Sequence, residues 1–249
     1  MKLAALYTVF NGLELLEASV NQLDVDVVII GYQTISNRGN KSEEVLPFIE
    51  EMKLKHPNWY FLNFEPDLSK HPNQNEINKH NLLLTLAKNL NCTHFLMSAT
   101  DHFYNREDFI KAKEISKNYD ATTTKMFTYY KEPTLQLTPI EDYEMLFICK
   151  LYPQSEFVRK NFPVVIDPAL KISTSKSFKS FDSSDIMMHH YSMLRIDINN
   201  KFDNSCASVN WSDELKEQFK EEYKHHQEGD AVSYFKGRRT IRVNNYFNL

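Results

Sequence analysis

Two short segments hold most of the side chains that could do chemistry. In the first, an apolar run of residues ends in Asp101 and His102, and open α/β sheets bind their ligands at the carboxyl ends of such strands. In the second, His189 and His190 are neighbours. Adjacent residues of a strand point to opposite faces, so only one of these histidines can face a given site. A carboxylate and an imidazole together suit a divalent cation such as Mn²⁺ or Mg²⁺.

Each of these residues also has a purely structural interpretation. Asp101 lies shortly before a predicted helix at 107–117, where an Asp often serves as the N-cap. A single buried histidine is more often a hydrogen-bonded core residue than a metal ligand. A second pair, His225 and His226, lies beside two glutamates and is predicted to belong to a solvated helix face.

The first hundred residues alternate between strand and helix patterns. Strands are predicted at 2–10, 25–30, 59–64 and 93–97, and helices at 13–23, 43–55 and 76–90. The first two strands are predominantly apolar, which is typical of parallel strands buried on both faces. This alternation predicts an α/β fold with right-handed crossovers. The loop 66–75 is long and contains two prolines, and we expect it to lie beside a ligand pocket.

The second half of the chain has a different character. Strands are predicted at 121–130, 145–151, 164–166 and 232–243, and helices at 107–117, at 192–202 and from 212 onward. Ser192 and Ser212 are the predicted N-caps of the last two helices. We therefore expect an α/β fold with a central, mixed but mostly parallel sheet flanked by helices, and a C-terminal helical extension.

The composition excludes several classes of protein. Among 249 residues, 42% are hydrophobic, and 33 acidic against 29 basic side chains give a net charge of −4. Such a chain buries a core and does not offer a surface built wholly for nucleic acid. The five glycines form neither a GxGxxG motif nor a P-loop, and three scattered cysteines form no disulfide framework. No apolar run approaches the roughly 18 residues of a membrane helix, so we expect a cytoplasmic protein, in the host cytoplasm if a phage encodes it.

Several motifs resemble those of a GT-A glycosyltransferase of the family 2 type, as found in phages and bacteria. Such proteins have an "RN" helix followed by a strand that ends in a D-x-D motif. Here Lys-His-Asn-Leu at 79–82 stands in the helix, and Asp-His-Phe-Tyr at 101–104 resembles the "DEFY" that ends the motif. The segment 188–205 resembles a later block of the same group. Ala99 replaces the first Asp of D-x-D, and the resemblance covers roughly residues 1–210.

The resemblance implies a GT-A-like domain over residues 1–210, with a C-terminal helix and basic strand at 211–249 packed on it. It implies a hexosyl- or pentosyltransferase with a nucleotide-sugar donor, a UDP-sugar being the first expectation. A metal ion, Mn²⁺ or Mg²⁺, is expected on Asp101 with His189 or His190. The residues expected to contact the donor are Thr8, Asn11, Gln33, Lys79, Ser98, Arg195 and Lys201.

The chemistry of such a transfer explains this choice of residues. The donor leaves as a diphosphate, whose charge a cation and basic side chains neutralise. Backbone amides at the start of the predicted Ser192 helix are expected to add to this. Transfer by direct displacement also needs a carboxylate that takes the acceptor's proton, and Glu141 and Asp142 lie in a suitable loop. We expect Asp101→Ala to abolish turnover and to leave the fold intact, because a strand-end Asp contributes little packing.

The acceptor is either a modified nucleic acid base or a surface glycan. The segment 236–242 holds four cations in seven residues, which predicts either a solvated strand end or a contact surface for polyanions. An apolar stripe of the last helix is expected to dock it on the domain and to bring Arg238, Arg239 and Arg242 near the rim of the site. The stripe consists of Leu215, Phe219 and Tyr223.

Two other functions are compatible with the same residues. One is a metal-dependent phosphoesterase or nuclease, although two-metal nucleases need several acids and the sequence offers Asp101 alone beside the histidines. The other is a catalytically silent GT-A-like binding protein. No feature of the sequence sets the oligomeric state.

Overall fold

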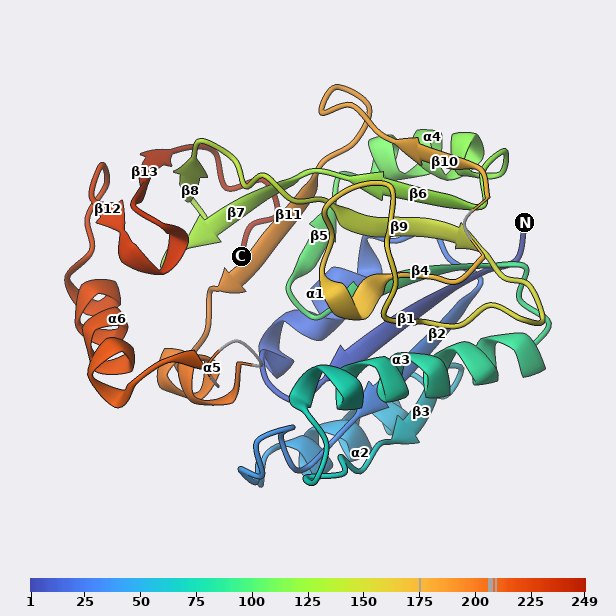
Figure 1. The fold of residues 1–249 in the computed structure, drawn as a ribbon, viewed down its shortest axis with the longest axis horizontal. Coiled ribbons are helices and arrows are strands. Elements are labelled where there is room, and N and C mark those ends of the chain that lie inside the picture. Colours follow the sequence, from blue (N-terminus) through green and yellow to red (C-terminus); the bar gives the residue numbers. More distant parts are fainter. Residues whose placement is uncertain (175, 206–207, 209) are drawn as a thin grey trace.

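The computed structural model describes residues 1–174, 176–205, 208 and 210–249, and these form two sheets with flanking helices (Figure 1). The larger sheet has the strand order β10-β6-β9-β4-β1-β2-β3, and the smaller one has the order β12-β13-β8-β7-β11-β5. In the larger sheet β9 is antiparallel to both of its neighbours, and the remaining pairs are parallel. The predicted fold class, α/β with a mostly parallel central sheet and a C-terminal helical extension, is confirmed.

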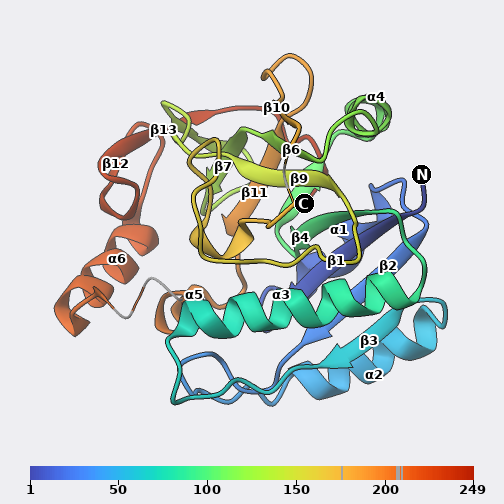
Figure 2. The same ribbon diagram turned by 45° about the vertical axis from the view of Figure 1, so that its right-hand side comes forward.

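The first half of the chain builds the parallel part of the larger sheet. Its elements are β1 (Leu3–Val9), η1 (Leu13–Leu15), α1 (Leu16–Asn21), β2 (Val27–Tyr32), α2 (Val45–Lys55), β3 (Tyr60–Asn63), α3 (Pro72–Asn89) and β4 (His94–Ala99). Every residue of β2 is buried, as its uniformly apolar sequence predicts. Helix α3 packs across β1 and β2 (Figure 2). Gly31 allows this close approach, because a Cβ atom there would lie 2.7 Å from Leu83 Cδ2.

The second half completes both sheets and adds the C-terminal extension. Its elements are β5 (His102–Tyr104), α4 (Arg106–Ser116), β6 (Ala121–Thr124), β7 (Met126–Tyr130), β8 (Leu135–Thr138), β9 (Met145–Lys150), η2 (Pro168–Leu170), β10 (Phe178–Ser180), β11 (Met188–Met193), α5 (Ile198–Asn204), α6 (Asp213–His225), β12 (Ala231–Val232), η4 (Ser233–Phe235) and β13 (Arg238–Arg242). Asn105 caps α4 by accepting from Glu107 N and Asp108 N, so Asp101 does not have the capping role considered above.

Two short segments carry the chain directly from the larger sheet into the smaller one. Strands β4 and β5 are separated by Thr100 and Asp101, and β6 and β7 are separated by Lys125. Strand β11 then lies between β5 and β7 in the smaller sheet, antiparallel to β5 and parallel to β7. Asp101 therefore lies at the junction of the two sheets, where residues of β11 come next to it.

The C-terminal extension packs through the predicted apolar stripe. Phe219 of α6 is buried in a cluster with Tyr130, Met193 and Phe202, and Leu215 and Tyr223 pack against that cluster. The Tyr223 hydroxyl donates a hydrogen bond of 2.8 Å to the Met193 carbonyl. Ser212 is the N-cap of α6, as predicted, and accepts from Leu215 N at 3.2 Å.

Several predicted elements differ from those observed. Ser192 does not start a helix: it lies in β11, and α5 begins at Ile198 with Asp197 as its cap. The reason is tertiary, because β5 and β7 provide strand partners for this segment. The predicted strand 164–166 reduces to one bridge, between Ile166 and Glu144.

Other differences concern the loop 66–75 and the last histidine pair. Helix α3 begins at Pro72, so the loop is shorter than predicted. The Asn75 side chain accepts a hydrogen bond from Asp67 N and donates one to the Asp67 carbonyl. His226 is buried, with Nε2 2.9 Å from Thr240 Oγ1, whereas His225 is solvated as expected. Among the described residues, no helix combines the length and apolar character needed to cross a membrane. The third cysteine, Cys206, lies outside the described residues.

Candidate functional site

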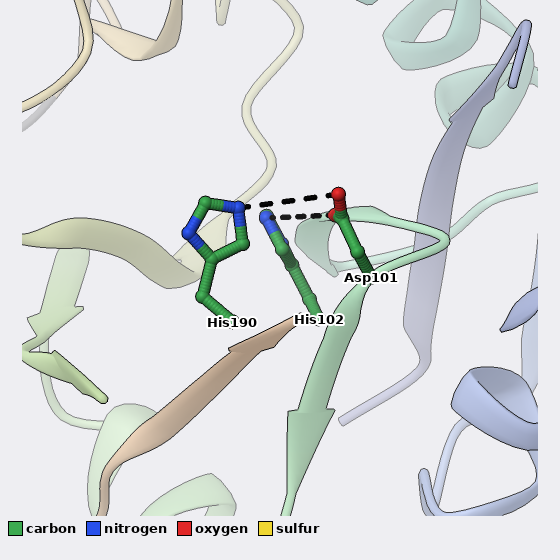
Figure 3. A group of neighbouring side chains, drawn as sticks. All are labelled: Asp101, His102 and His190. Atoms are coloured by element: carbon green, nitrogen blue, oxygen red, sulfur yellow. Dashed lines mark ion pairs between the residues drawn. The ribbon is translucent and has the colours of Figure 1, made fainter. Parts of the chain in front are cut away.

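Asp101, His102 and His190 point toward one another at the junction of the two sheets (Figure 3). His102 Nε2 lies 3.7 Å from Asp101 Oδ1, and His190 Nε2 lies 4.0 Å from Asp101 Oδ2. One ligand atom from each of the three residues lies within 4.8 Å of the others. We call these residues the carboxylate–imidazole group. A carboxylate oxygen and two imidazole nitrogens form a donor set that fits a divalent cation.

His189 and His190 point to opposite faces of β11, as the strand geometry requires. His189 Nδ1 lies 2.7 Å from the Tyr129 hydroxyl, and its ring packs among aromatic side chains that include Tyr246 and Phe247. The sequence left open whether His189 or His190 accompanies Asp101. In the structure His190 does so, because His189 faces away from Asp101. The second imidazole beside Asp101 belongs to His102. This residue directly follows Asp101 in the motif, but it was not predicted from the sequence to be a ligand.

Arg195 dominates the electrostatics of the carboxylate–imidazole group. Its Nη2 donates to Asp101 Oδ2, and the two side chains are only 3% and 6% exposed. Burial by itself raises the pKa of Asp101, but Arg195 and, to a lesser degree, the two histidines and Lys201 together outweigh it and hold this pKa far below its usual range. Burial also lowers the pKa of His102, and lowers the pKa of His190 to about 3, so both rings are neutral at pH 7.

A cavity of about 200 Å³ lies on one side of this group and collects most residues predicted to contact a donor. It is lined by Thr8, Asn11, Gln33, Lys79, Asp101, Arg195 and Lys201, among others. Lys79 is buried and donates to Gln33 Oε1 at 2.9 Å and Glu76 Oε1 at 3.0 Å, so it is not a surface charge of the helix. We call this the first cavity.

A second cavity of about 300 Å³ adjoins the first and shares Thr8, Asp101 and Lys201 with it. It contains Ser98, the remaining predicted donor contact, together with both histidines of the carboxylate–imidazole group. Asn73 also lines this cavity. The end of the predicted 66–75 loop therefore reaches the pocket, as expected, but as the first turn of α3.

The two predicted proton acceptors do not line either cavity. Glu141 accepts from Thr128 Oγ1 at 2.5 Å, and Asp142 is 95% exposed and pairs with Arg238 at 2.9 Å. Both lie on a third cavity, which touches the second one at Tyr143. Besides Asp101 and Glu76, the second cavity contains the carboxylate of Asp167.

Asp167 was not identified from the sequence as a candidate site residue, because no local sequence pattern distinguishes it from the other acidic residues. It caps η2 by accepting from Ala169 N at 2.7 Å, and the surrounding protein raises its pKa by desolvation. The Asp-Pro pair at 167–168 is a helix-start signal that marks the cap. Its place in the same cavity as His190 depends on the path of the chain after β9, which no local pattern encodes.

The arginines of the basic segment are not at the rim of the first two cavities. Arg238 pairs with Asp142, Arg239 donates to the Gly229 carbonyl at 2.7 Å, and Arg242 pairs with Glu228 at 3.1 Å. The stripe of α6 docks as expected, but β13 pairs with β8 at the far side of the smaller sheet from β5. This register keeps the three arginines away from Asp101.

No protein-family model matches the sequence, and no curated protein matches it. Residues 1–349 of S. aureus TarS, in complex with UDP-GlcNAc, are similar over 51% of this chain and 35% of that chain, with 18% identity and a TM-score of 0.38. A mannose-1-phosphate geranyltransferase from Thermus thermophilus is similar over 61% of this chain and 51% of that chain, with 11% identity and a TM-score of 0.36.

The mannosyltransferase PcManGT from Pyrobaculum calidifontis, in complex with GDP-Man and Mn²⁺, is similar over 53% of this chain and 36% of that chain, with 11% identity and a TM-score of 0.34. The matched regions therefore span between about a third and a half of the length of these three structures.

Proposed function

We propose that this protein is a GT-A-like glycosyltransferase that moves a sugar, a hexose or a pentose, from a nucleotide-sugar donor to an acceptor hydroxyl. The observation that carries the proposal is the position of the carboxylate–imidazole group between two adjoining cavities, with Arg195 and Lys201 beside it. In this proposal residues 1–210 form the transferase domain, and residues 211–249 are an extension packed on it.

The first cavity receives the nucleoside diphosphate part of the donor. Its polar lining offers donors and acceptors to a base and ribose, with the buried Lys79 held by Gln33 and Glu76. Lys201 lines both cavities and Arg195 lines the first one beside Asp101, and these two side chains neutralise the phosphates. Arg195 is already positioned by its ion pair with Asp101, so little side-chain ordering is needed when the donor binds.

Asp101, with His102 and His190, would hold the Mn²⁺ or Mg²⁺ ion. When bound, such an ion acts as a Lewis acid that stabilises the charge developing on the leaving diphosphate. The two rings are neutral and therefore offer lone pairs without adding positive charge. Ala99, in the place of the first D-x-D carboxylate, contributes no ligand, so Ser98 and Gln33 are left to contact the donor there.

The second cavity receives the transferred sugar and the acceptor, and Asp167 takes the acceptor's proton. The acceptor oxygen forms the new bond to the sugar's anomeric carbon, and the diphosphate leaves with the electrons of the broken bond. The raised pKa of Asp167 makes it a better proton acceptor than an ordinary Asp. We place it in this role in preference to Glu141 and Asp142, which lie outside both cavities.

A glycan is the better acceptor candidate. The basic segment was the sequence feature that favoured nucleic acid, and its arginines are engaged within the protein by Asp142, Gly229 and Glu228. Two of the three charges are paired with carboxylates, and the third guanidinium is bound by a backbone carbonyl, so the segment has less to offer a phosphate backbone. The third cavity, bounded by Tyr143, Tyr234 and Phe235, provides aromatic faces of the kind on which sugar rings stack.

The test is a screen of nucleotide sugars for hydrolysis or transfer in the presence of MnCl₂. Wild-type protein is expected to release a nucleoside diphosphate from at least one donor, and Asp101→Asn and Asp167→Asn to lower the rate at least 100-fold. Asp213→Asn is the matched control, because this carboxylate is 93% exposed on α6 and lines none of the three cavities. Absence of turnover with every donor contradicts the proposal, and release from phosphodiesters instead supports the phosphoesterase alternative.

A further inference from the structure

The part of the site that the sequence did not assign is His102, and its position depends on the pairing of β5 with β11. In this antiparallel pair His190 is directly opposite His102, and Met188 is opposite Tyr104. Side chains of directly opposed residues project from the same face of a sheet. The two rings lie accordingly with their centroids 5.3 Å apart, both on the side of Asp101. The backbone ladder thus holds the two imidazoles in place.

Both rings have unmet hydrogen-bonding capacity. The Nδ1 atoms of His102 and His190 are buried and have no hydrogen-bond partner within the described part of the chain. Their Nε2 atoms are too far from Asp101, at 3.7 and 4.0 Å, for a hydrogen bond. Buried polar atoms without partners cost free energy and are rare in folded proteins. The orphaned atoms are Nδ1, whereas the atoms that face Asp101 are Nε2, so it is the two Nε2 atoms, which approach the carboxylate without hydrogen-bonding to it, that indicate a further ligand between the rings and Asp101.

The spacing of the three donors suits a cation. A metal ion about 2.1–2.2 Å from each ligand requires ligand atoms roughly 3–4.4 Å apart. The two distances from Asp101, 3.7 and 4.0 Å, lie inside this range. The longest separation in the group, at most 4.8 Å, needs only a small rotation of one ring.

The chemistry of the donor set distinguishes between cations. Mg²⁺ prefers oxygen ligands, whereas first-row transition metal ions accept imidazole readily. Within the carboxylate–imidazole group only Asp101 is acidic, and Arg195 already compensates its charge. A hard ion that depends on anionic oxygens gains little from such a group, while an ion that binds nitrogen gains two ligands.

We infer that His102 is the third ligand of the cation site, and that this site takes Mn²⁺ or a similar first-row transition metal ion in preference to Mg²⁺. The inference deepens the function proposed above and narrows its cofactor. It concerns binding, however, and can be tested without any donor turnover.

The experiment measures Mn²⁺ binding by EPR, with MnCl₂ alone and with MnCl₂ plus UDP. Wild-type protein is expected to bind Mn²⁺, to show modulation from two imidazole nitrogens in pulsed spectra, and to retain Mn²⁺ against a tenfold excess of MgCl₂. His102→Gln is expected to weaken Mn²⁺ binding at least tenfold and to leave the modulation of one imidazole. His102→Glu, which supplies an oxygen ligand, is expected to let Mg²⁺ displace Mn²⁺.

Two controls keep these outcomes distinct. His225→Gln changes a histidine whose side chain is 71% exposed on α6 and is expected to bind Mn²⁺ as the wild type does. Circular dichroism and a thermal melt establish that each His102 variant is folded, and His102→Ala replaces any variant that is not.

Three results would overturn the inference: no Mn²⁺ binding to wild type in either condition, unchanged binding in the folded His102 variants, or equal competition by Mg²⁺. Failure of the inference is separable from failure of the proposed function. Sugar transfer that persists in EDTA retains the transferase and rejects the metal site, whereas Mn²⁺ binding without any turnover retains the site and rejects the transferase.

Discussion

Replacing Arg195 by Met is expected to destabilise the protein strongly. The Arg195 and Asp101 side chains are 3% and 6% exposed, so the variant leaves a carboxylate buried without its guanidinium partner. Of the other groups near Asp101, the two histidines lie at 3.7 and 4.0 Å and are kept neutral by burial, and Lys201 contributes only a weaker positive charge than Arg195. Breaking a buried ion pair from one side costs about 3–5 kcal/mol. That is a large share of the roughly 5–15 kcal/mol that stabilises a typical domain.

The same structure corrects the expectation that Asp101 can be removed without harm to the fold. Asp101→Asn leaves the Arg195 charge buried and is also expected to destabilise the protein. The double variant Asp101→Asn with Arg195→Met removes both charges. Its loss of stability is therefore expected to fall short of the sum of the single losses by about 1–3 kcal/mol.

The loss of the Arg195 charge also sets how the stability difference between the wild type and Arg195→Met depends on pH. In the wild type the pKa of Asp101 is depressed by Arg195, so the pair's contribution is present above the unfolded pKa of about 3.9 and is lost as the pH falls toward the folded pKa. In Arg195→Met the strongest opposing charge is lost while burial remains, so the folded pKa rises from its wild-type value even though Lys201 still lies nearby. Such a carboxyl favours the folded state less at neutral pH than the wild-type one does, and the two differ less in acid. The difference in unfolding free energy between the two proteins is therefore expected to shrink as the pH falls from 7 through the folded pKa of the variant.

Urea unfolding followed by circular dichroism measures all of these quantities. Arg242→Met is the matched control, because Arg242 and its partner Glu228 are 53% and 48% exposed and such pairs contribute about 0–1 kcal/mol. A loss below 1 kcal/mol in Arg195→Met, or a difference from wild type that grows as the pH falls, would refute the reasoning.

Three further changes test how the fold supports the site. Gly31→Ala is expected to cost about 1–3 kcal/mol in thermal unfolding and to weaken nucleotide binding measured by calorimetry, because the new Cβ would lie 2.7 Å from Leu83 and push α3 away. Phe219→Ala is expected to cost about 3–5 kcal/mol in urea unfolding, since this 6% exposed ring anchors α6; unchanged protease resistance of α6 would contradict this. Ser212→Ala removes the hydroxyl that accepts from Leu215 N and is expected to cost about 1 kcal/mol by the same measurement, with Ser212→Thr close to wild type.

The sequence by itself determined the elements whose pattern is local. The alternation of apolar strands and amphipathic helices through β4 follows from periodicity, and it was predicted with boundaries close to those observed. The cap and apolar stripe of α6 were readable for the same reason. So were the position of Asp101 at a strand end and the opposite directions of His189 and His190, which depend only on the pleat of a single strand.

Only the tertiary structure decided which of these residues meet. His190 joins His102 because β11 inserts beside β5 in one register, a pairing across nearly ninety residues that also placed the predicted helix cap Ser192 in a strand. The burial of Lys79, the Arg195 ion pair and the approach of Asp167 depend likewise on contacts between distant segments. A residue's own neighbours in sequence determine which face of an element it occupies. Which residue of another element it meets is set by strand register and by the packing of elements far apart in the chain.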